Sequence, residues 1–368
     1  MLYENKILFI PLLILVGSIF LFSINSVSSK DYGLVIIPED VNDDRADYDL
    51  KPSLSSFAEK FENVNGLNKE NDDEQFVGSQ NLSADFNFAL AGDWGCTKNT
   101  KKTVKLIQNH EHDIIFSLGD TSYAPDLDCW LDIVNPISDK MKVILGNHDV
   151  MSLNLLEQQL EKFELNKAYY SFDYNNIHFL MMDSESSYLP GADPVFSDLE
   201  NTDQYRFVEN DLSKVSINPA IKWIIVMNHR QFYSSVCGEH DSCDPIKKLR
   251  DAYHPLFQRY GVDILFSGHA HNYQRTYPLF YNDVNSSEPI IEQNAKTEYK
   301  SPKGMFQIIT GTGGIDLDPL SNQEPYVVYQ QDASYGFLNV KITDQGNVLI
   351  GKYYSNDGNV LDEFKIIK

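Results

Sequence analysis

Carboxylate, phenol, amide and imidazole side chains recur directly after short apolar runs in the central part of the chain. The polar clusters are Gly92-Asp93-Trp94-Gly95, Gly119-Asp120-Thr121-Ser122-Tyr123, Gly146-Asn147-His148-Asp149, Asn228-His229 and Gly268-His269-Ala270-His271. Their oxygen and nitrogen donors are Asp93, Asp120, Tyr123, Asn147, His229, His269 and His271. A mixed donor set without thiolate suits a hard or borderline metal ion such as iron, manganese or zinc.

The number of these donors exceeds what a single metal ion uses. Two ions bridged by a shared carboxylate are therefore the economical arrangement. Two ions about 3.5–4 Å apart can hold both the attacking and the leaving oxygen of an in-line phosphoryl displacement. The glycines beside the ligands allow the backbone to approach closely where larger residues would crowd the site. The pattern predicts a dinuclear metal centre with chemistry directed at phosphate esters.

The apolar runs that precede the clusters are typical of strands buried on both faces of a sheet. They cover residues 86–91, 114–118, 143–145, 224–227 and 264–266. The clearest helix between them is 244–260, with Asp244 as N-cap, Pro245 at the first helical position and Gly261 after its end. Because residues beyond the carboxyl ends of strands meet in one crevice of an α/β sheet, we expect the five clusters to converge.

Other segments predict antiparallel strands. A hairpin is expected from 169–174 and 177–182 around Asn175-Asn176, and three further strands near 337–342, 348–354 and 360–367. The expected fold class is α/β with mixed sheets: two packed mixed β-sheets flanked by helices, in one domain over residues 84–368.

The motif order resembles the calcineurin-like metallophosphoesterase superfamily. Gly-Asp-x-Gly, Gly-Asp-x-x-Tyr, Gly-Asn-His-Asp, Val-x-x-His with an asparagine beside the histidine, and Gly-His-x-His are all intact over about residues 86–275. Tyr123 together with Asn147 makes the chain similar to the purple acid phosphatases in particular. The resemblance implies the four-layer sandwich of that superfamily.

The resemblance also implies a role for each residue. A ferric site would be formed by Asp93, Asp120, Tyr123 and His271. A divalent site, for Fe, Zn or Mn, would be formed by Asp120 as the bridge, Asn147, His229 and His269. His148 would contact the substrate phosphate and assist the leaving group. Arg230 and His240 are candidates for a further substrate contact.

These roles describe an acid phosphatase acting on phosphate monoesters. A hard ferric ion lowers the pKa of its bound water, so that metal-bound hydroxide can attack phosphorus in acid, while a protonated His148 assists the departing alkoxide. The alternatives are a phosphodiesterase or nucleotide pyrophosphatase with the same metals, a purely divalent centre, and a non-catalytic surface protein on the same scaffold.

The N-terminal segment predicts export. Residues 7–22 are almost continuously apolar and would form a helix of about 24 Å, short of the roughly 30 Å bilayer core. Ser26-Val27-Ser28 then offers the small residues that a signal peptidase favours. Residues 1–28 are interpreted as a secretory signal or, alternatively, an N-terminal membrane anchor. Residues 29–83 are expected to form an acidic, disordered spacer, because residues 31–80 hold 13 acidic and 4 basic residues. The expected location is secreted or extracellular.

Charge and cysteine content limit the partners. The 368-residue chain carries a net charge of −23, which disfavours nucleic acid and favours small phosphoesters. Cys237 and Cys243 close a short loop that suits a disulfide in an exported protein, and Cys96 and Cys129 could form a second one. Asn81-Leu82-Ser83 and Asn285-Ser286-Ser287 are glycosylation sequons. The oligomeric state is left open.

Overall fold

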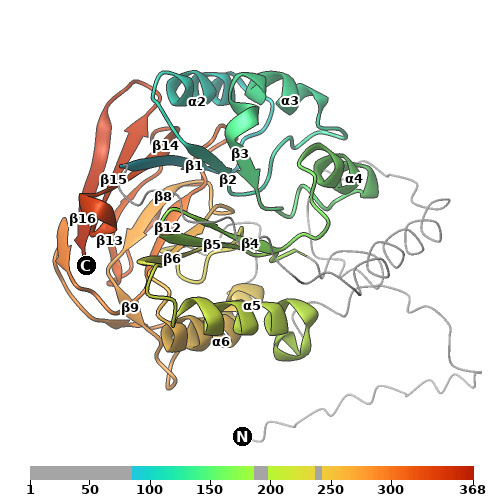
Figure 1. Ribbon diagram of the computed structural model, residues 1–368. Coiled ribbons are helices and arrows are strands. Elements are labelled where there is room, and N and C mark those ends of the chain that lie inside the picture. The colour runs from blue at the N-terminus through green and yellow to red at the C-terminus, as the bar shows by residue number, and fades with distance from the viewer. Residues whose placement is uncertain (1–84, 186–197, 237–242) are drawn as a thin grey trace, which may run out of the picture. The chain divides into compact units, whose positions relative to one another are not determined.

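Two seven-stranded mixed β-sheets form the framework of the computed structural model (Figure 1), which describes residues 85–185, 198–236 and 243–368. The first sheet has the order β11 (Glu298–Lys300), β16 (Val360–Ile367), β15 (Val348–Ser355), β14 (Gly336–Thr343), β1 (Phe86–Ala91), β2 (Ile114–Ser117) and β3 (Met141–Val143). The second has the order β13 (Val327–Gln331), β8 (Tyr273–Thr276), β12 (Phe306–Thr310), β7 (Ile264–Ser267), β6 (Trp223–Met227), β5 (Ile177–Met181) and β4 (Tyr170–Tyr174). A separate small ladder pairs β9 (Leu279–Phe280) with β10 (Ile290–Ile291).

Each sheet contains a parallel block that determines where the polar clusters lie. In the first sheet, β1, β2 and β3 run parallel, while β14 pairs antiparallel with β1. In the second, β5, β6, β7 and β12 run parallel. The strands β2 and β7 are short, apolar except for a final serine, and buried at every residue, as expected for strands covered on both faces. The carboxyl ends within each block therefore open at one edge of its sheet.

Helices cover the outer faces of the two sheets (Figure 1). On the first sheet, α2 (Lys98–Gln108), α3 (Asp128–Val134) and the 3-10 turn η1 (Asn135–Lys140) share an apolar core with β1 to β3. On the second, α5 (Asp203–Val215) and α6 (Cys243–Tyr260) pack against β5 to β7. A third core, rich in phenylalanine, lies between the two sheets. The remaining helical elements are α4 (Leu153–Lys162), η3 (Leu199–Asn201) and η4 (Asp344–Gly346). The expected four-layer arrangement is confirmed.

Most of the predicted elements are found, with shifts at some ends. The hairpin β4–β5 turns at Asn175, which has φ +54°, and the three tail strands are β14, β15 and β16. The helix predicted to start after Asp244 begins at Cys243, and Gly261 with φ +74° ends it while the Val262 N–H donates to the Phe257 carbonyl.

One predicted strand was placed wrongly. The run expected at 143–145 forms a strand at 141–143, because the ladder partner β2 ends at Ser117. Beyond that point the Ile144 N–H still donates to the Ser117 carbonyl at 3.1 Å. The ligand-bearing cluster at Gly146 therefore follows a short connection rather than the strand directly.

In the described ranges, no helix is long and apolar enough to cross a membrane. The predicted signal or anchor (1–28) and acidic spacer (29–83) lie outside the described residues.

Candidate metal centre

The seven predicted ligands converge from both sheets. Clusters after β1, β2 and β3 come from the first sheet, and clusters after β6 and β7 come from the second. The Tyr123 hydroxyl lies 3.2 Å from Asp93 Oδ1, 3.0 Å from Asp120 Oδ2 and 3.0 Å from His271 Nε2. These four side chains form one group of donors around a common point.

A second group adjoins the first. His229 Nε2 lies 3.4 Å from Asp120 Oδ2, 3.2 Å from Asn147 Oδ1 and 3.3 Å from His269 Nδ1. The predicted members of the two sites are thus the residues that the fold brings together.

Asp120 belongs to both groups. Donor atoms of Asp93, Asp120 and His271 lie within 4.8 Å of one another, and so do those of Asp120, His229 and His269. Asp120 Oδ2 faces Tyr123 on one side and His229 on the other, while Oδ1 accepts a hydrogen bond of 2.8 Å from the His148 backbone N–H. One carboxylate oxygen is therefore placed to bridge two ions.

Backbone geometry at the site is unusual for L-amino acids. Asp93, Asp120, Tyr123 and His269 have φ values of +58°, +52°, +54° and +67°. Left-handed conformations at residues other than glycine are uncommon and concentrate where the surrounding structure imposes them. Here the Asp93 N–H donates to the Gly119 carbonyl at 3.1 Å and the Trp94 N–H to the Asp120 carbonyl at 2.9 Å. Neighbouring loops thus hold the ligands in position.

Two glycines beside the ligands are sterically required, as predicted. A Cβ at Gly119 would lie 2.6 Å from His229 Nδ1, and one at Gly268 would lie 2.6 Å from Asp93 Oδ2. Both distances are well below any real carbon contact, so larger residues would displace the donors.

Hydrogen bonds on the far side of two imidazoles orient them. His229 Nδ1 donates to the Leu118 carbonyl at 2.7 Å, and His271 Nδ1 donates to the Asp316 carbonyl at 2.9 Å. Because a carbonyl can only accept, each ring directs Nε2 at the centre, which is the arrangement that metal-binding histidines usually show.

The electrostatics of the site fit bound cations. Burial lowers the pKa of His229, but Asp120 and its neighbouring carboxylates outweigh burial and raise that pKa to about 10. Burial likewise opposes ionisation of Asp120, yet His229 holds its pKa far below the usual range. Burial and the charges of Asp120 and Asp93 raise the pKa of Tyr123 well above 10. In the ion-free protein, protons on the histidine and tyrosine side chains thus offset the negative charge of the buried carboxylates. Bound metal ions would supply the positive charge in place of these protons.

His148 lies beside the donor groups. Its ring packs on that of Tyr123, with centroids 4.2 Å apart, and its side chain is half-buried. This position leaves the imidazole near the centre without making it part of either group of donors.

Of the two candidate substrate contacts, Arg230 is buried. Its Nε lies 3.0 Å from Glu185 Oε1 in a fully buried ion pair, and its Nη1 lies 3.1 Å from His269 Nε2. His240 lies outside the described residues.

Sequence reasoning missed three features of the site. Asp149 is only the last residue of the motif Gly146-Asn147-His148-Asp149, and no motif includes Glu185. The segment 311–318 was also missed, although Gly314 N–H and Ile315 N–H donate to the Asp93 carbonyl at 3.0 and 3.1 Å. Its signal was present as Gly311-Thr312-Gly313-Gly314 directly after the apolar run 306–310.

A disulfide braces the first group of ligands. Cys96 and Cys129 are bonded across 33 positions, joining the loop after Asp93 to the segment after Tyr123. The predicted pairing of Cys96 with Cys129 is confirmed, whereas the Cys237–Cys243 pairing lies outside what the structure describes. Of the two sequons, Asn285 is exposed and Asn81 lies outside the described residues.

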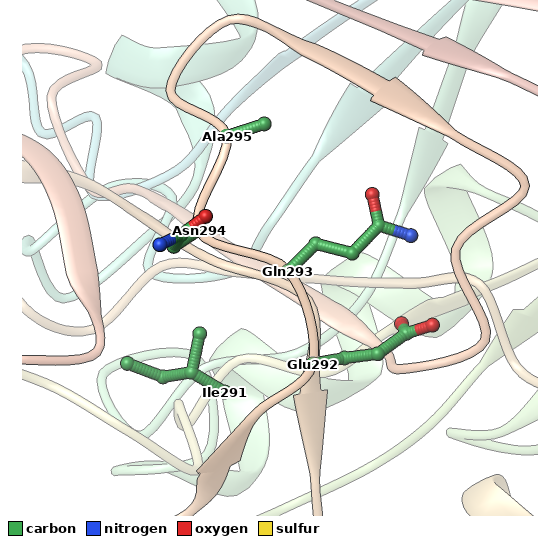
Figure 2. A pocket seen from close by; sticks show the side chains of 5 residues that line it. All are labelled: Ile291, Glu292, Gln293, Asn294 and Ala295. Atoms are coloured by element: carbon green, nitrogen blue, oxygen red, sulfur yellow. The ribbon is translucent and has the colours of Figure 1, made fainter.

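An open pocket of about 690 Å³ lies elsewhere, at residues 291–295 after β10. Figure 2 shows Ile291, Glu292, Gln293, Asn294 and Ala295 around it. The Glu292 carboxylate already accepts hydrogen bonds from the Lys303 and Gly304 N–H groups. Because none of the converging donors lines it, this pocket is separate from the candidate metal centre.

Known proteins with similar sequences carry the same family signature. Residues 86–273 match the model of the calcineurin-like phosphoesterase family. A protein named probable inactive purple acid phosphatase 1, from Arabidopsis thaliana, is 30% identical over 73% of this chain and 45% of its own length. A nucleotide pyrophosphatase/phosphodiesterase from Hordeum vulgare is 28% identical over 74% of this chain and 76% of its own.

A solved structure shares the fold. Purple acid phosphatase PPD1 from yellow lupin seeds superposes with a TM-score of 0.60 at 23% identity, covering 77% of this chain and 54% of that one. The chain spans about half the length of several curated relatives that it matches. The chain belongs to the calcineurin-like phosphoesterase family, and its resemblance to the purple acid phosphatases is confirmed.

Proposed function

We propose that this protein is a dinuclear metal-dependent acid phosphatase that hydrolyses phosphate monoesters. The observation that carries the proposal is the single oxygen, Asp120 Oδ2, that faces both groups of donors. A carboxylate shared by two groups of donors is what a pair of ions at phosphoryl-transfer distance requires.

The donor types favour different ions at the two positions. Asp93, Asp120 and Tyr123 with His271 would hold Fe(III), because anionic oxygen ligands favour a hard trivalent ion. Asp120 with the neutral donors Asn147, His229 and His269 would hold a divalent ion, which we propose to be Fe, Zn or Mn. When bound, such a pair supplies an activated water and positive charge against the phosphate.

The protein's own side chains would complete the chemistry. His148, which packs on Tyr123 beside the centre, would hold a proton for the departing alkoxide, a typical general-acid role. Arg230 and His240 are proposed as further substrate contacts; Arg230 Nη1 lies 3.1 Å from His269 Nε2, which places its guanidinium next to the second group of donors.

We further propose that the protein is exported, either secreted or held at the membrane by an uncleaved N-terminal segment. A disulfide between Cys96 and Cys129 supports an oxidising compartment. Exposed Asn285 would then be available for glycosylation.

Two alternatives have support among the relatives. The barley protein is named a nucleotide pyrophosphatase/phosphodiesterase, which favours diester cleavage by the same ligands as the second candidate. Another relative is named probable inactive, so a non-catalytic protein on the same scaffold is the outcome to exclude. The presence here of all seven donors and His148 supports an active centre.

Three measurements test the proposal. The iron-loaded protein should show a visible tyrosinate-to-Fe(III) band, and a colourless, fully active protein without iron would overturn the ferric assignment. Hydrolysis of a monoester and a diester near pH 5 and near pH 7 separates the activities, with faster monoester cleavage expected in acid. Activity that persists unchanged in Asp120→Asn would overturn the proposed centre.

A further inference from the structure

Asp149 lies beside the candidate centre but belongs to neither group of donors. Its carboxylate is buried, with 1% of the residue exposed. Oδ1 accepts hydrogen bonds from the Thr121 N–H at 2.9 Å and the Thr121 hydroxyl at 2.6 Å. Oδ2 accepts from the Asp120 N–H at 2.7 Å and the Gly146 N–H at 2.8 Å. With these four donors, the buried carboxylate is fully hydrogen-bonded by the two loops around it.

Those donors belong to the loops that carry ligands. Asp120 and Thr121 follow β2, whereas Gly146 directly precedes Asn147 after β3. Asp149 Oδ2 therefore ties the backbone of the shared ligand to the segment of another ligand. Asp120 adopts φ +52° where the Asp149 bond is made, so the contact helps to hold an uncommon conformation.

A second hydrogen bond joins the same two loops, with the donor now on the loop that carries Asp149. Asp120 donates its N–H to Asp149, and its side-chain Oδ1 accepts the His148 N–H at 2.8 Å. Fixing both the backbone and one carboxylate oxygen of Asp120 leaves a single direction for Oδ2. That direction is towards Tyr123 and His229, where both groups of donors meet.

We propose that Asp149 is a positioning residue that aims the bridging carboxylate of Asp120, so that the two ions bind as a pair. This inference rests on the proposed dinuclear centre. It assigns to Asp149 no contact with an ion or with substrate. Loss of its hydrogen bonds should weaken ion binding while the fold persists.

Two substitutions remove the hydrogen bonds in steps. Asp149→Asn keeps the size of the side chain but leaves one acceptor oxygen, so its amide NH₂ must face the Thr121 N–H or the Asp120 and Gly146 N–H groups. Asp149→Leu removes every acceptor. Co²⁺ titrated into the ion-free protein should bind about 10–100-fold more weakly to Asp149→Asn, with an altered visible spectrum, and more weakly still to Asp149→Leu.

Two control variants separate positioning from general stability. Asp263 is also a carboxylate that accepts a backbone N–H, from Ile224 at 2.8 Å, but it lies where β7 begins, at the opposite end from the ligands. Asp263→Asn should leave Co²⁺ affinity unchanged. Thr121→Val removes the hydroxyl that donates to Oδ1 and accepts from Gln159 Nε2 at 2.9 Å. It should retain most of the affinity, because Oδ2 keeps both of its donors.

The outcomes are distinguishable. Wild-type protein that binds two Co²⁺ ions, together with Asp149→Asn that binds them equally tightly, overturns the inference and leaves the dinuclear centre standing. Wild-type protein that fails to bind two ions overturns the proposed function itself. Thermal unfolding of each ion-free variant completes the test: if the affinity of Asp149→Asn falls only as far as in an equally destabilised Asp263→Asn, the positioning role is wrong.

Discussion

The imidazole of His148 lies against the phenol ring of Tyr123, with ring centroids 4.2 Å apart and planes inclined by 34°. The proposed proton donor thus rests on the proposed ferric ligand. A variant that keeps the Tyr123 ring is needed to separate the two functions, because removing the ring would also leave His148 without support.

Tyr123→Phe keeps that ring and removes only the hydroxyl. We expect the visible band to disappear and iron to bind about tenfold or more weakly, because the anionic phenolate donor is lost. Absorption spectra and iron content measure both effects. Tyr170→Phe is the control, since the half-buried Tyr170 donates its hydroxyl hydrogen to the Val143 carbonyl at 2.9 Å rather than to a proposed ligand. A band that survives in Tyr123→Phe would assign the colour to another group.

His148→Ala removes the proposed proton donor but retains the backbone N–H that binds Asp120. The kcat for a monoester with a poor leaving group should fall by about 10²–10⁴, whereas an ester with a good leaving group should be affected far less. Metal content should match the wild type, and His110→Ala provides the control. Equal losses for both esters would show that His148 does not protonate the leaving group.

His178 is predicted to make stability depend on pH. Burial lowers its pKa, but Asp173 at 2.7 Å and Asp211 at 2.8 Å outweigh burial and raise the pKa to about 9. Because the ordinary value is about 6.5, this stabilisation is complete below about pH 6.5 and is lost as the pH rises through about 9.

The expected contribution is about 3 kcal/mol in the free energy of unfolding. Denaturant unfolding of ion-free protein across that pH range should show the loss in the wild type and not in His178→Gln. An identical pH profile in the two proteins would remove His178 as the cause, and His110→Gln should behave as the wild type.

Metal ions should stabilise the fold, because each proposed ion takes ligands from both sheets. At a free ion concentration about a thousand times the dissociation constant, the gain is about 4 kcal/mol. A chelator should therefore lower the melting temperature of the wild type and have little effect on Asp120→Asn. If the chelator left the melting temperature of the wild type unchanged, the proposed binding of ions between the two sheets would be wrong.

Glu185→Gln would leave the Arg230 guanidinium buried without its counter-charge. The side chains of the pair are 0% and 2% exposed, so the free energy of unfolding should fall by about 3–5 kcal/mol. The exposed pair Arg206–Asp203 supplies the control, because Asp203→Asn should change stability little. Urea unfolding measures both, and a small loss in Glu185→Gln would mean that water screens the pair.

The convergence of the predicted donors could be expected from the sequence because most of them follow closely after a buried apolar run. Asp93, Asp120, His229 and His269 needed only the rule that strand ends converge. Asp149 and Glu185 could not be assigned in this way, since their partners are set by which loops face each other across the site. Asp149 is 29 positions from the N–H of Asp120, and Glu185 is 45 from Arg230. Local sequence motifs do not specify which residues so far apart in the chain will form hydrogen bonds.

The strands that follow the ligands in the chain complete both sheets but carry none of the proposed ligands. Every proposed ligand lies before residue 274, yet β1 is paired on one side by β14, and β12 completes the parallel block of the second sheet. A fragment ending after β8 would expose the edge of β1 and lose the tail residues Leu338, Val340 and Phe364 from the core between the sheets. Such an unpaired edge favours aggregation. We therefore expect that the segment containing all the ligands does not fold on its own.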